Sequence, residues 1–117
     1  MLNLEKIIHI DGKDILFKST GATALRYKAQ FHRDFFAEIV KMAVLEEILT
    51  GKIGEADPEK IDLEIFYRIS WVMAKTADKN IQPMMEWLDS FDEFPIFDVI
   101  EQINDLIASM LQTTKKK

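Results

Sequence analysis

The chain has 117 residues, of which 48% are hydrophobic and 30% are charged, and its formal net charge at pH 7 is −5. This balance predicts one globular domain over residues 1–117, because the apolar content is too high for a disordered chain. Disulfides and thiolate metal sites are excluded by the absence of cysteine, and no apolar run approaches the ~20 residues that a membrane-spanning helix needs.

Charge is distributed unevenly along the chain. Residues 1–52 contain 7 acidic and 8 basic residues, whereas residues 53–114 contain 13 acidic and only 4 basic ones. An acidic C-terminal half repels phosphate backbones, so nucleic acid is not expected as a partner. The terminal lysines predict a flexible basic tail over 113–117, and the N-terminus lacks the apolar centre of a secretory signal, so a cytoplasmic protein is expected.

Residues 1–18 predict a β-hairpin. Two β-rich runs flank Asp11 and Gly12, a dipeptide that tolerates the positive φ of a tight turn. Alternate residues of a strand share one face, and the apolar residues on that face are Ile8, Ile10, Ile15 and Phe17. A lone hairpin is marginal in water, so this one must lie on the helices that follow or pair its edge with another chain.

Residues 23–49 predict a helical region without Gly or Pro that is either continuous or broken near His32. Arg33 and Asp34 at that point either cap the break or face a partner, and the capping role is favoured. Two neighbouring stripes of this region are apolar, which makes the apolar face unusually wide. The first stripe contains Phe35, Ile39 and Met42, and the second contains Phe36, Val40 and Ala43.

Gly51, Gly54 and Pro58 predict a loop over 50–61, and residues 62–112 predict a second helical region. Its first helix is apolar except for one narrow polar stripe, a pattern typical of a central helix covered on most sides. That stripe contains Glu64, Arg68, Lys75 and Lys79. Pro83 suits the start of a short helix, and Pro95 suits the start of the last one. The predicted fold is therefore mainly α, with about five helices and a short N-terminal β-hairpin.

The sequence contains no complete motif for catalysis, cofactor binding or metal binding. The glycines form no phosphate-binding loop, and the two histidines stand 23 positions apart without a second nitrogen ligand near either. Asp57, Glu59 and Asp62 lack the glycine and the terminal glutamate of a calcium loop. No enzymatic activity, cofactor or metal is expected.

The segment 84–97 is the richest in large apolar side chains. Its members are Met84, Met85, Trp87, Leu88, Phe91, Phe94 and Phe97. Aromatic residues and methionine are enriched at protein-binding surfaces, so the segment predicts a partner-binding face. A second core cluster explains the same residues equally well.

The order of these features resembles the tail assembly chaperones of long-tailed phages and prophages of Gram-positive bacteria. The resemblance covers residues 7–111 and departs from the family pattern at His32, where the family tends to have Gly. The residues that carry the resemblance most specifically are 25–27, Phe31, Arg33, Asp34, 73–78, 86–88 and Phe91.

The resemblance implies a non-enzymatic protein of the host bacterial cytoplasm that is absent from the mature virion. Its expected partners are the tape measure protein and the tail tube protein, and a homo-oligomer is expected. The predicted partner-binding residues are Met84, Trp87, Leu88, Phe91, Phe94, Tyr27 and Arg33. The alternative is a host regulatory or adaptor module that docks one amphipathic helix.

Overall fold

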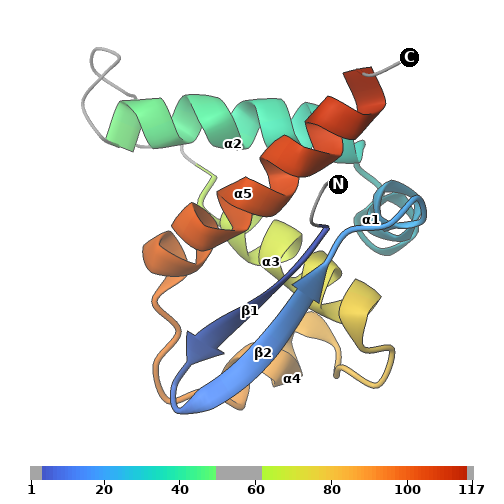
Figure 1. Ribbon diagram of the computed structural model, residues 1–117. Helices are drawn as coiled ribbons and strands as arrows, with labels where there is room; N and C mark the ends of the chain where they lie inside the picture. Colours follow the sequence, from blue (N-terminus) through green and yellow to red (C-terminus); the bar gives the residue numbers. More distant parts are fainter. Residues whose placement is uncertain (1–3, 50–61, 116–117) are drawn as a thin grey trace.

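The computed structural model describes residues 4–49 and 62–115 (Figure 1). The predicted fold class is confirmed, since this part of the chain forms five helices and one two-stranded antiparallel hairpin. The predicted loop over 50–61 and the last two lysines lie outside the described residues. Within the described ranges, every helix is too short or too polar to cross a membrane.

The hairpin consists of β1 (Glu5–Ile10) and β2 (Lys13–Lys18). Asp11 and Gly12 have φ values of 53° and 76°, which is the two-residue turn whose twist matches that of the strands. On one face Ile8, Ile10 and Phe17 are at most 1% exposed. This face packs on helix α3 (Glu64–Ala77), so the hairpin lies on the helices, as one of the two predicted alternatives requires.

The first helical region is broken at His32, as the sequence indicates. Helix α1 (Thr23–Phe31) ends there because His32 adopts the left-handed conformation with φ of 60°. Helix α2 (Phe35–Leu49) begins three residues later, and the carboxylate of Asp34 accepts a hydrogen bond from the N–H of Ala37 at 2.9 Å. Asp34 therefore has the predicted capping role.

Helix α3 is the central element, and α1, α2, α5 and β2 all contact it. Most of its residues are buried, which confirms the prediction of a helix covered on most sides. Arg68 belongs to the predicted polar stripe of this helix, yet it is only 5% exposed. Its charge is neutralised by a glutamate on another helix, a contact that the pattern of one helix does not reveal.

The two proline-started helices are also confirmed. Helix α4 (Met84–Asp89) follows Pro83, and helix α5 (Ile96–Lys115) follows Pro95. The apolar face of α5 is buried through Val99, Ile100, Ile103, Leu106 and Ile107. Helix α5 runs to Lys115, three residues beyond the end predicted for the second helical region.

Candidate protein-binding surface

Helix α2 carries apolar side chains around most of its circumference. The side that faces the core is buried through Phe35, Ile39, Met42 and Leu45. On the opposite side, Phe36, Val40 and Val44 are 39%, 63% and 43% exposed. Residues four positions apart lie one above the other on a helix, so these three form a continuous apolar row, the α2 row. A helix that is apolar all round is expected to be covered all round, and the described residues cover only one side of α2.

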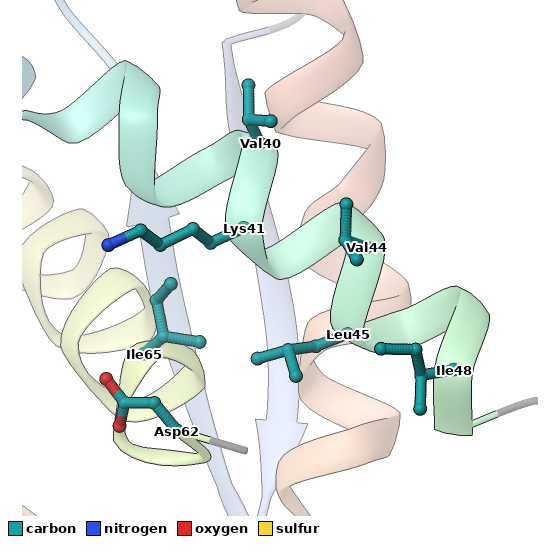
Figure 2. A pocket seen from close by; sticks show the side chains of 7 residues that line it. All are labelled: Val40, Lys41, Val44, Leu45, Ile48, Asp62 and Ile65. Carbon is teal, nitrogen blue, oxygen red and sulfur yellow. The ribbon is translucent and has the colours of Figure 1, made fainter. Parts of the chain in front are cut away.

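An open groove of about 300 Å³ adjoins the α2 row. Figure 2 shows that Leu45 of α2 and Ile65 of α3 point toward each other across the groove, and both are buried. Lys41 and Asp62 lie on the same side of the groove, next to Ile65, and supply one charge of each sign. The residues that line the groove are Val40, Lys41, Val44, Leu45, Ile48, Asp62 and Ile65.

A buried ion pair fixes α2 against α3 beside this groove. Arg68 of α3 donates from Nη2 to Oε1 of Glu38 at 3.0 Å and to Oδ2 of Asp62 at 2.9 Å. Glu38 is 2% exposed, and its Oε1 also accepts a hydrogen bond of 2.6 Å from the hydroxyl of Tyr27 on α1. Three helices therefore meet at one carboxylate, which orients the groove lining.

The titration of this network follows from burial and pairing. Burial raises the pKa of Tyr27, and the hydrogen bond to Glu38 raises it further. Burial opposes the charge on Arg68, but its hydrogen bonds to Asp62, Tyr27 and Glu38 outweigh this and raise its pKa. Burial likewise opposes the charge on Asp62, yet hydrogen bonding to Arg68 leaves its pKa lowered. Tyr27 therefore remains protonated, and Arg68 and Asp62 remain charged, around neutral pH.

The predicted partner-binding segment around α4 lies mostly in the core. Trp87 is 2% exposed and Phe91 is 8% exposed, while Met84, Leu88 and Phe94 are partly buried against the core. The ring of Trp87 lies 5.3 Å from that of Phe91, 5.4 Å from that of Phe94 and 6.4 Å from that of Phe17 on β2. Of the two alternatives that the sequence left open for this segment, the geometry favours core packing, and Trp87 and Phe91 belong to the same buried cluster as the rest of the core.

The other two predicted site residues occupy different environments. Tyr27 is fully buried in the Glu38 network, so its side chain offers no surface to a partner in this conformation. The side chain of Arg33 is 48% exposed, and its Nη1 lies 3.8 Å from Oε2 of Glu38. Arg33 is therefore open to solvent at the junction of α1 and α2, far along the chain from the α4 cluster.

The sequence did contain a signal for the α2 row. The second apolar stripe of 23–49 includes Phe36 and Val40, and together with the first stripe it predicts an unusually wide apolar face. An apolar pattern on both sides of a helix does not tell which side the rest of the chain covers. Only the packed structure distinguishes the exposed Val40 from the buried Ile39.

Comparisons of the chain with protein-family models, curated proteins and solved structures give no significant match. Within residues 4–49 and 62–115, no group of three or more histidine and acidic side chains is placed to hold a metal ion. The candidate surface is therefore defined by the exposed apolar row on α2 and the groove beside it.

Proposed function

We propose that the chain is a non-enzymatic phage or prophage tail assembly chaperone, and that the α2 row covers an apolar helix of the tape measure protein. In this proposal it acts in the host bacterial cytoplasm, also binds tail tube protein while the tail is being built, and does not enter the mature virion. The single observation that carries the proposal is the exposed row of Phe36, Val40 and Val44. Large exposed apolar patches mark protein-binding sites.

The shape of the surface suits a helical partner. A row of residues four positions apart is the ridge that packs into the groove of another helix. A long helical tape measure needs its apolar surface covered until tube protein polymerises around it. Burying the exposed parts of Phe36, Val40 and Val44 contributes roughly 2 to 4 kcal/mol, or more than about tenfold in affinity. The charges of Lys41 and Asp62 beside the apolar groove can orient the partner.

Two substitutions test which apolar surface binds. Val40 on α2 and Met85 on α4 are 63% and 66% exposed, so replacing either with lysine perturbs the free protein to a similar extent. Each variant is co-expressed with the tape measure protein of the same phage or prophage, and the soluble fraction of that partner is measured. We expect Val40→Lys to leave the tape measure protein insoluble and Met85→Lys to keep it soluble.

The opposite pattern, with solubility lost only for Met85→Lys, would place the binding face on α4, as first predicted from the sequence. If both variants keep the partner soluble, the α2 row is not the covering surface. Thermal unfolding of both variants accompanies the assay, because a change in exposed surface residues is expected to alter the free energy of unfolding by only about 0.5 kcal/mol.

A second candidate function is supported by the groove. Its apolar floor between α2 and α3, with Lys41 and Asp62 at one side, also suits a single amphipathic helix of a host protein. In that case the chain is a regulatory or adaptor module. A tape measure protein that stays insoluble with the wild-type chain would favour this function over the chaperone.

A further inference from the structure

The hairpin is a two-stranded sheet, so both of its outer edges lack a strand partner within the described residues. In a two-residue hairpin the residues next to the turn exchange backbone hydrogen bonds, and every second pair does so. Ile10 and Lys13 flank this turn, and the bond of 2.8 Å from the N–H of Ser19 to the carbonyl of Leu4 continues the alternation at the far end. The backbone groups of Asp14, Leu16 and Lys18 therefore point away from β1.

The two edges of the hairpin differ in their surroundings. Helix α5 contacts β1 (Figure 1). Lys6 of β1 also forms an ion pair of 2.9 Å with Asp105 of α5. Helix α3 covers the buried face of β2. Within residues 4–49 and 62–115, no backbone hydrogen bond between elements reaches Asp14, Leu16 or Lys18. The edge of β2 lies on the far side of the hairpin from β1 and α5, so it is the edge more open to strand addition.

The sequence of β2 is complementary to itself when two copies run antiparallel. With Leu16 opposite Leu16 of a second copy, Asp14 stands opposite Lys18 in both halves. These are the residues whose backbone groups point outward, so the register that pairs the charges is also one that backbone pairing allows. A shift of this register by one residue would set each outward-pointing residue opposite a residue whose backbone groups point inward, toward β1. The backbone hydrogen bonds between the two copies could then not form.

We propose that this chain forms a two-fold symmetric dimer by antiparallel pairing of β2 with β2 of a second copy, centred on Leu16. The two hairpins then form a single four-stranded sheet. On its outer face Leu16 is paired across the hairpin with Ile7, and the two are 38% and 63% exposed. The dimer joins these two exposed pairs into one apolar row across the sheet. The proposal does not depend on the partner proposed for the α2 row.

Charge reversal tests the register. Asp14→Lys alone places lysine opposite Lys18 of the second copy, and Lys18→Asp alone places aspartate opposite Asp14. Each variant is expected to dimerise about tenfold more weakly than the wild-type chain in sedimentation equilibrium, because like charges stand opposite each other twice. An equimolar mixture of the two variants places opposite charges at both positions and is expected to restore the dimer.

The mixture also separates dimer contacts from effects within one hairpin. Oδ1 of Asp14 lies 2.9 Å from Nδ1 of His9, and Lys18 stands opposite Glu5 in the hairpin. Each substitution therefore also changes contacts within its own chain. Mixing cannot repair those internal changes. A wild-type chain that stays monomeric at millimolar concentration overturns the proposal, and so does a mixture that dimerises no better than the single variants.

A crosslinking pair tests the same geometry by a different readout. The natural chain has no cysteine, so Leu16→Cys and Ile7→Cys each introduce a single thiol. In the dimer two Leu16 positions face each other, whereas two Ile7 positions lie about 14 Å apart, at three strand spacings. Under mild oxidation Leu16→Cys is expected to form a disulfide-linked dimer much faster than Ile7→Cys, although Ile7 is the more exposed. Equal rates, or a faster Ile7→Cys, would contradict the pairing.

Discussion

Two regions of this molecule are rich in large apolar side chains, and they differ in what lies over them. The segment around α4 has Trp87, Phe91 and Phe94 packed against one another and against Phe17 of the hairpin. The outer side of α2 has Phe36, Val40 and Val44 in a row, and the described residues leave that row open. Apolar composition is similar in the two regions. The presence or absence of a covering element decides which becomes core and which becomes surface.

Truncation of Trp87 tests the covered half of this comparison and has the largest expected effect. Trp87→Ala should lower the free energy of unfolding by about 3 to 5 kcal/mol, because a buried aromatic residue leaves a cavity. Met85→Ala, in the same helix but 66% exposed, is the matched control and should change stability by less than about 0.5 kcal/mol. Urea unfolding measures both. Equal stability of the two variants would mean that Trp87 is not a core residue.

Breaking the ion pair that holds α2 in place has the next largest expected effect on stability. Arg68→Met keeps the volume of the side chain but leaves Glu38 buried, and it should cost about 3 kcal/mol of stability. Arg33→Met removes a half-exposed partner 3.8 Å from the same glutamate and should cost less than about 1 kcal/mol. Thermal unfolding of the two variants compares these costs. A smaller effect for Arg68→Met than for Arg33→Met would contradict the buried network.

The hydroxyl of Tyr27 should contribute a pH-dependent part of the same stability. Since the pKa of Tyr27 is raised in the folded protein, its contribution is fully present below the ordinary tyrosine value of about 10 and is lost as pH rises above it. Tyr27→Phe should lower stability by about 1 to 3 kcal/mol at neutral pH. It should also make the decline in stability above that pH less steep.

Tyr67→Phe is the control for this measurement, because Tyr67 lies on α3 only partly buried. Unfolding curves between neutral and alkaline pH give the slope for each variant. If Tyr27→Phe and wild type lose stability equally steeply above the tyrosine range, Tyr27 does not couple folding to pH.

The start of α2 gives the smallest expected effect. Asp34→Ala removes the acceptor for the N–H of Ala37 and should cost about 0.5 to 2 kcal/mol of stability. Asp34→Asn keeps a capping oxygen and should retain most of the wild-type value. Calorimetric melting distinguishes the two variants. Loss of partner binding with unchanged melting would instead assign Asp34 to the interface.

Local features of the fold could be predicted because their causes are local. Asp11 and Gly12 indicate a tight turn wherever they occur between β-rich runs, and the structure gives both a positive φ. His32 ends α1 in the left-handed conformation, which glycine adopts most easily. The sequence could therefore predict a break at His32.

Features that depend on distant parts of the chain could not be predicted in this way. Trp87 is core because Phe17, seventy positions earlier, packs on it. Arg68 is buried because Glu38 comes from a different helix. Whether Val40 is exposed depends on whether another element of the fold packs on its side of α2. Periodicity identifies an apolar face but not the element that covers it.

The most direct test of the central claim measures how a partner changes access to the two regions. Val40→Cys and Met85→Cys place a single thiol at two sites of nearly equal exposure in a chain without natural cysteine. The rate of alkylation of each is measured with and without bound tape measure protein. Slower labelling of Val40→Cys in the complex, with unchanged labelling of Met85→Cys, is the predicted result. Protection of Met85→Cys with free labelling of Val40→Cys would contradict the account and return the binding face to α4.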